Sequence, residues 1–92
     1  MEIEYDPNKN EKNIRERGLS FEKVHEFDFA SAAYQIDDRK DYGETRIRAF
    51  GKIGNRVYVL VYKWINEDAI RVISFRKANK REVTQYEQET QS

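Results

Sequence analysis

Positive side chains are concentrated near the carboxyl end of the chain. Residues 71–81 read RVISFRKANKR, and this segment contains no Asp or Glu. Its five cations are Arg71, Arg76, Lys77, Lys80 and Arg81. A cluster of this kind is the usual electrostatic footprint of a phosphate-bearing or acidic partner. The competing interpretation is a solvated surface with ordinary lysines and arginines.

Groups that exchange protons near neutral pH are scarce. His25 is the single histidine, and imidazole is the side chain that ordinarily changes charge in this range. It lies far in sequence from the basic segment, which favours a structural or surface role over catalysis. The other acid or base candidates could serve only if their surroundings shifted their pKa. These candidates are Tyr86, Lys63, Lys80 and Glu44.

Length and composition limit the class of protein. A chain of 92 residues fits one domain, which we expect to span residues 1–92. The 17 basic and 17 acidic residues balance, but residues 1–46 carry a net charge of −4 and residues 47–92 a net charge of +4. The basic half is therefore where we expect an anionic partner to bind.

The absence of cysteine excludes disulfides, thiolate nucleophiles and cysteine-based zinc sites. One histidine also argues against a histidine-rich metal site, so we expect no metal and no cofactor. No apolar run approaches the roughly 18 residues of a membrane span. The first residues lack the basic and apolar regions of a signal peptide, and we expect a cytoplasmic protein.

Hydrophobic periodicity and capping residues predict an α+β fold with a largely antiparallel sheet. Asp6 and Pro7 are typical of a helix start, and Gly18 is typical of a helix end. Ser20 begins a second short helix, and Asn79 with Glu82 has the spacing of a capping box. Strands are expected at 3–5, 33–37, 45–53, 57–62 and 69–76. The predicted order of elements is β-α-α-β-β-β-β-α.

Strand alternation predicts which side chains share a face. In strand 45–53, Arg46, Arg48 and Phe50 point one way. If strand 69–76 is regular, Arg71 points opposite to Arg76, so the two arginines should have different roles. Arg71 would then either contact a ligand or pair with an acid from the first helices.

Several segments together resemble the BrnT family, over about residues 3–87. They are DPNK at 6–9, Asn13 followed by GLSFE at 18–22, ETR at 44–46, IRVISFRKA at 70–78, and Arg81-Glu82 with Tyr86. The 70–76 segment is the most specific of them. The chain departs from the family at Arg17, where a histidine is common, at residues 63–68, where a threonine and an arginine are usual, and at Phe75, which is usually smaller.

The resemblance implies a RelE-like fold and a toxin of a type II toxin–antitoxin module that cleaves RNA. It also implies neutralisation by a BrnA-like antitoxin that itself carries the DNA-binding domain. Operator DNA would then be contacted only through the antitoxin.

Metal-independent RNA cleavage requires cations around the phosphate and groups that move two protons. We predict four catalytic residues: Arg76, Lys80, Arg81 and Tyr86. Five further residues are predicted to bind RNA: Arg46, Arg48, Lys63, Arg71 and Lys77. Phe50 with Tyr58 and Tyr62 could stack a base.

Two other functions fit the same pattern. The basic surface and the final helix could form a binding module that docks an antitoxin-like partner without turnover. A DNA-binding regulator is the third option, but zero net charge and the lack of a helix-turn-helix pattern argue against it.

Overall fold

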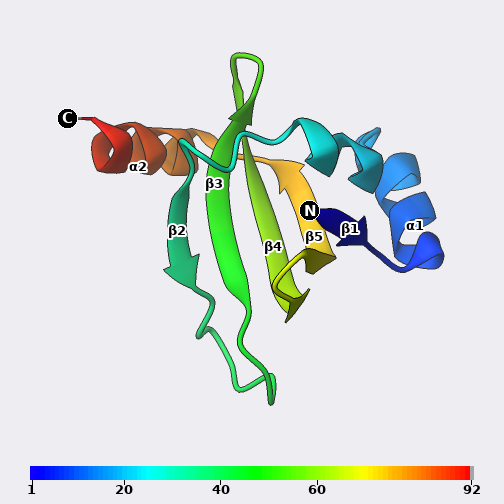
Figure 1. The fold of residues 1–92 in the computed structure, drawn as a ribbon. Helices are drawn as coiled ribbons and strands as arrows, with labels where there is room; N and C mark the ends of the chain where they lie inside the picture. Colours follow the sequence, from blue (N-terminus) through cyan, green and yellow to red (C-terminus); the bar gives the residue numbers. More distant parts are fainter. Residues whose placement is uncertain (92) are drawn as a thin grey trace.

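The computed structural model describes residues 1–91 and contains one five-stranded sheet, with a helix packed on each of its faces and another beside it (Figure 1). The strands are β1 (Glu2–Glu4), β2 (Ala33–Ile36), β3 (Ile47–Ile53), β4 (Arg56–Asn66) and β5 (Ala69–Lys77). The helices are α1 (Pro7–Arg17), the 3₁₀ helix η1 (Phe21–Glu26) and α2 (Lys80–Thr90). The predicted element order and the α+β class are confirmed, with the second helix of the 3₁₀ type.

The sheet has the strand order β1-β5-β4-β3-β2. Strands β2 to β5 pair antiparallel, and only β1 runs parallel to its neighbour β5. Consecutive antiparallel strands need only short connections, such as the tight β3–β4 and β4–β5 turns. The sheet is therefore largely antiparallel, as predicted.

Local capping chemistry defines the helix ends. The Asp6 side chain accepts a hydrogen bond from the backbone N–H of Asn8, and Pro7 occupies the first turn of α1. Gly18 ends α1 in the left-handed conformation, with a φ of 64°. Asn79 and Glu82 form the reciprocal capping box at the start of α2. These short-range interactions satisfy backbone groups that a helix leaves unpaired at its termini.

One face of the sheet, here called the covered face, packs under η1. Its buried core includes Leu60, Val72 and Phe75 from the sheet, together with Phe21 and Val24 from η1. Asn13 of α1 supports this layer because its side chain donates hydrogen bonds to the carbonyl oxygens of Leu19 and Phe75. The covered face is therefore closed to a large ligand over most of its area.

The opposite face is divided into two parts. Tyr86 and Val83 of α2 pack on Phe50, Val57 and Val59 at one end of the sheet. The rest has no helix over it among residues 1–91, and we call it the open face (Figure 1). Among the described residues, no helix is both long enough and apolar enough to cross a membrane.

A bulge in β5 changes the predicted alternation. Val61 pairs with Ser74, but Tyr62 pairs with Val72, so Ile73 is an extra residue. Directly paired residues share a face, and an extra residue reverses the alternation beyond it. Arg71 and Arg76 therefore lie on the same face of the sheet. The expectation that they point in opposite directions is wrong, since it assumed a regular strand.

Candidate nucleic-acid interface

Five cations from three strands lie on the open face. β3 contributes Arg48 with Arg46 just before it, β4 contributes Lys63, and β5 contributes Arg71 and Arg76. The register brings them together because Val61 lies opposite both Arg48 and Ser74, and Lys63 lies opposite Arg71. All five belong to the predicted site.

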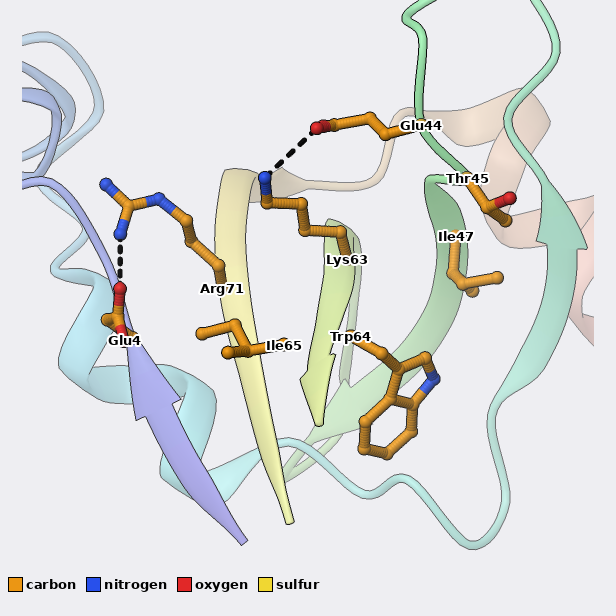
Figure 2. A pocket seen from close by; sticks show the side chains of 8 residues that line it. All are labelled: Glu4, Glu44, Thr45, Ile47, Lys63, Trp64, Ile65 and Arg71. Atoms are coloured by element: carbon orange, nitrogen blue, oxygen red, sulfur yellow. Dashed lines mark hydrogen bonds and ion pairs between the residues drawn. The ribbon is translucent and has the colours of Figure 1, made fainter. Parts of the chain in front are cut away.

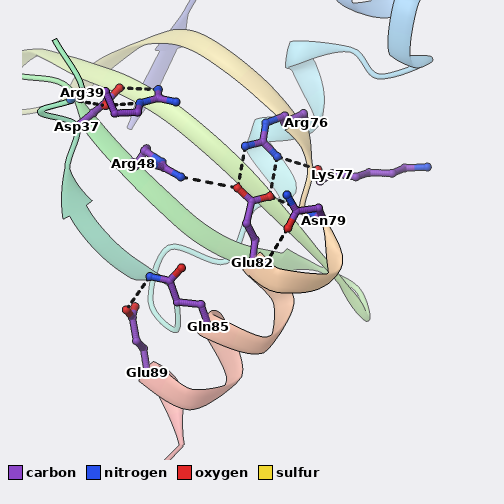
Figure 3. Close-up of polar contacts among 9 residues, drawn as sticks. All are labelled: Asp37, Arg39, Arg48, Arg76, Lys77, Asn79, Glu82, Gln85 and Glu89. Carbon is purple, nitrogen blue, oxygen red and sulfur yellow. Dashed lines mark hydrogen bonds and ion pairs between the residues drawn. The ribbon is translucent and has the colours of Figure 1, made fainter.

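Glu82 joins two of these arginines to the start of α2 (Figure 3). Its carboxylate accepts hydrogen bonds from both terminal nitrogens of Arg76, at 2.7 and 2.8 Å. The nearest nitrogen of Arg48 lies 3.7 Å from the same carboxylate. Glu82 is only 7% exposed, and the hydrogen bonds from Arg76 lower the pKa of its carboxyl from 4.5 to about 2. The carboxylate therefore stays ionised and fixes the position of both guanidinium groups.

Arg48, Arg76 and Glu82 form a cluster, here called the Glu82 cluster, in which two positive charges meet one negative charge. The Nε of Arg48 is buried and has no hydrogen-bond partner within residues 1–91. The Arg48 guanidinium also lies over the Phe50 ring, 5.2 Å from its centroid. A guanidinium with incomplete hydrogen bonding is costly to bury, which favours an anion beside it.

Glu44 holds the second pair of cations. Its carboxylate accepts hydrogen bonds from Arg46 and from Lys63, each at 3.0 Å. Both partners lower the pKa of Glu44, with the Lys63 hydrogen bond as the larger cause. The Arg46 guanidinium also lies over the ring of Tyr42, 3.9 Å from its centroid, in a cation–π contact.

Arg71 completes the face through an ion pair with Glu4 of β1. A hollow of about 190 Å³ lies between α1 and the open face and connects Arg71 with Arg46, Lys63 and Lys9. Across the open face, five cations meet the three carboxylates of Glu4, Glu44 and Glu82. The surface therefore keeps a net positive charge, as an anionic ligand requires.

The remaining predicted residues lie around this face. Lys77 pairs with Tyr58, and its side chain points away from the Glu82 cluster (Figure 3). Lys80 and Arg81 are exposed in the first turn of α2. Tyr86 is buried, and its hydroxyl donates a hydrogen bond of 3.4 Å to the carbonyl oxygen of Ser31. Its predicted catalytic role is untested by this geometry.

The aromatic residues expected to stack a base do not share one face. Phe50 is buried beneath α2, whereas Tyr58 and Tyr62 pair with β3 residues of the covered face. The three rings therefore do not form one stacking surface. His25 lies on η1 at the covered face, remote from the cations.

The counter-charges Glu82 and Glu4 were absent from the predicted site. The capping-box spacing already accounted for Glu82 in the sequence, so its pairing with Arg76 and Arg48 was not expected. Glu4 required the parallel pairing of β1 with β5, which juxtaposes it with Arg71. Glu44 could be interpreted from the sequence either as an acid or base or as a partner of Arg46. In the structure it pairs with Arg46.

The fold and this surface define a small α+β protein whose sheet presents arginines and a lysine on one uncovered face. Residues 5–82 match the family described as "Ribonuclease toxin, BrnT, of type II toxin-antitoxin system". The chain therefore belongs to the BrnT family of ribonuclease toxins.

A solved structure supports this assignment. The chain is similar to the crystal structure of the Brucella abortus ribonuclease toxin BrnT, with a TM-score of 0.65 and 29% sequence identity. The similarity covers 87% of this chain and 99% of that one. Comparison with curated protein sequences gives no match.

Proposed function

We propose that this chain is an active endoribonuclease that cuts RNA on the open face without a metal ion. The observation that carries the proposal is the shared face of Arg48, Arg76, Lys63 and Arg71 in a member of a ribonuclease toxin family. A strand of RNA lying across β3, β4 and β5 would meet these cations in succession.

The reaction we propose is a phosphodiester transesterification. The 2′-oxygen forms a new bond to phosphorus, the bond to the 5′-oxygen breaks, and the products end in a 2′,3′-cyclic phosphate and a 5′-hydroxyl. The 2′-hydroxyl loses a proton and the 5′-oxygen gains one. Arg76 and Arg48 would stabilise the negative charge that grows on the phosphate, and the exposed Lys80 and Arg81 would contact it from α2.

The partner we propose is a BrnA-like antitoxin. Membership in a type II toxin–antitoxin family implies an antitoxin. Binding of the antitoxin would neutralise the toxin, and operator DNA would be contacted only through the antitoxin.

Cleavage of single-stranded RNA by the purified chain, with a chelator present, tests the proposal. We expect cyclic-phosphate products, and no cleavage of an all-2′-deoxy oligonucleotide. Arg76→Lys keeps the charge but loses the paired hydrogen bonds, so cleavage should fall by roughly 100-fold or more. Arg56→Lys, at the exposed first residue of β4, is the matched control. Full activity of Arg76→Lys would contradict the proposed role of Arg76.

Salt dependence tests whether the open face binds the phosphates. Lys63→Ala should lower the magnitude of the slope of log affinity against log salt by about 0.7, the value for one phosphate contact of a single strand. Arg56→Ala should leave the slope unchanged. Equal slopes for the two variants would remove Lys63 from the interface.

A non-catalytic module that docks the antitoxin is the second candidate. It is favoured by the carboxylates that already bind Arg46, Lys63, Arg71 and Arg76, since a phosphate would have to compete with them. Under this alternative, Arg76→Ala and Lys80→Ala weaken antitoxin binding and no RNA cleavage is ever observed. Under the first proposal, the same variants lose cleavage and growth arrest but still bind the antitoxin.

A further inference from the structure

A second hollow lies beside the last residues of β4, where Lys63, Trp64 and Ile65 face the segment that leads into β3 (Figure 2). Its volume is about 660 Å³, within the roughly 300–1,000 Å³ typical of ligand sites. Glu44, Lys63 and Arg71 line both this hollow and the smaller one on the open face. The two hollows are therefore neighbouring parts of one surface.

This hollow differs from the rest of the basic surface because it is lined by an exposed aromatic side chain, that of Trp64. Trp64 is the only tryptophan, and 52% of its surface is exposed. Its ring packs edge-on against Tyr62, with a centroid distance of 6.0 Å and an interplanar angle of 80°. Tyr62 is buried and packs edge-on in turn against Phe29 at 6.3 Å. The indole is therefore supported at one edge while much of its surface faces solvent.

The hollow connects the two sides of the sheet. Lys63 and Trp64 are consecutive in β4, so their side chains project to opposite faces. In Figure 2, Lys63 and Arg71 lie on one side of the hollow and Trp64 lies on the other. A nucleic-acid strand that leaves the open face at Lys63 would reach the indole next.

We infer that this hollow is a subsite for one unpaired nucleotide of single-stranded RNA, with the base stacked on Trp64 and its phosphate bound by Lys63 and Arg71. The inference rests on the proposed function, because it extends the same RNA path. Every base offers a ring face to an aromatic side chain, and cations beside the ring hold the backbone. Double-stranded RNA keeps its bases stacked and paired, so the subsite selects single strands.

The fluorescence of Trp64 reports directly on the subsite, because no other tryptophan contributes. The probe is a single-stranded 2′-O-methyl oligonucleotide, whose blocked 2′-oxygen prevents cleavage. We expect binding to quench the fluorescence. An abasic oligonucleotide of equal length, which keeps the phosphates and lacks the bases, should bind without quenching, and so should a double-stranded probe.

Substitution gives the magnitude. Trp64→Ala should weaken binding of the single strand by roughly 5- to 150-fold, the range found for loss of one base–aromatic contact. Trp64→Phe, which keeps a ring, should recover most of the affinity in an anisotropy assay. Ile36→Ala is the matched control, because Ile36 is 60% exposed and does not line the hollow.

Two results would overturn the subsite: quenching by the abasic probe equal to that by the full probe, or unchanged affinity of Trp64→Ala. Loss of antitoxin binding in Trp64→Ala with intact RNA binding would instead assign the indole to a protein interface. The outcome is separable from the proposed function. Quenching of Trp64 fluorescence without cleavage of unmodified RNA would contradict the nuclease proposal alone. Cleavage without quenching would contradict the subsite alone.

Discussion

Replacing Glu82 by Gln tests the central ion pair. Glutamine keeps the size of the side chain and can still accept the capping hydrogen bond from the backbone of Asn79. It removes the charge that binds Arg76 and Arg48. Lowering a carboxyl pKa from 4.5 to about 2 corresponds to about 3 kcal/mol of stability for the ionised fold. We therefore expect Glu82→Gln to lower the free energy of unfolding by about 2–3 kcal/mol near neutral pH.

The pH dependence separates this charge effect from a packing effect. A carboxyl whose pKa is depressed by folding stabilises the fold fully above its unfolded pKa, here 4.5, and loses that contribution as the pH falls towards about 2. The difference between Glu82→Gln and the parent should shrink over this interval.

Urea unfolding of both proteins, at several values from neutral pH down to about pH 3, measures this difference. Glu87→Gln, at an exposed position of the same helix, is the control and should change stability by less than about 0.5 kcal/mol. A loss of stability in Glu82→Gln that stays constant with pH would refute the assignment of the depressed pKa to the ion pair.

Three further outcomes follow from the same structure. Glu82→Gln should bind non-cleavable RNA more tightly than the parent in filter binding, since it releases two guanidinium groups; weaker binding would contradict the open-face path. Asn13→Ala should cost about 1–3 kcal/mol in urea unfolding, because two part-buried carbonyl oxygens lose their donor, whereas Asn8→Ala should cost far less. Gly51→Ala should lower thermal stability by about 1–3 kcal/mol, since an added Cβ would lie 2.6 Å from the Phe27 ring; an unchanged melting temperature would argue against that packing.

Helix ends were predictable because their chemistry is local. The Asp6 cap, the left-handed Gly18 and the Asn79 capping box each depend on residues within a few positions of one another. The order of elements along the chain followed from equally local patterns, whereas the order of the strands within the sheet was not predicted.

The sequence pattern could not predict which residues of different strands lie opposite one another in the sheet. The bulge at Ile73 depends on how β5 meets β4, and the Arg71–Glu4 pair depends on β1 entering the sheet beside β5. Glu82 reaches Arg48 only because α2 folds back over β3. The five cations and the Glu44–Arg46 pair were therefore within reach of the sequence pattern, whereas the counter-charges Glu4 and Glu82 and the shared face of Arg71 and Arg76 were not.

The spacing of the two arginines in β5 now has a geometric meaning. Five positions separate Arg71 from Arg76, an odd number that would place them back to back in an unbroken strand. Because Ile73 has no partner in β4, an even number of paired positions separates the two arginines, and the bulge keeps both side chains on the open face. Deleting Ile73 would shorten the interval to four positions in a regular strand, so both arginines would stay on the open face without the bulge. A change that straightens β5 while keeping its length would instead turn one of them to the covered face, which makes strand length here as constraining as residue identity.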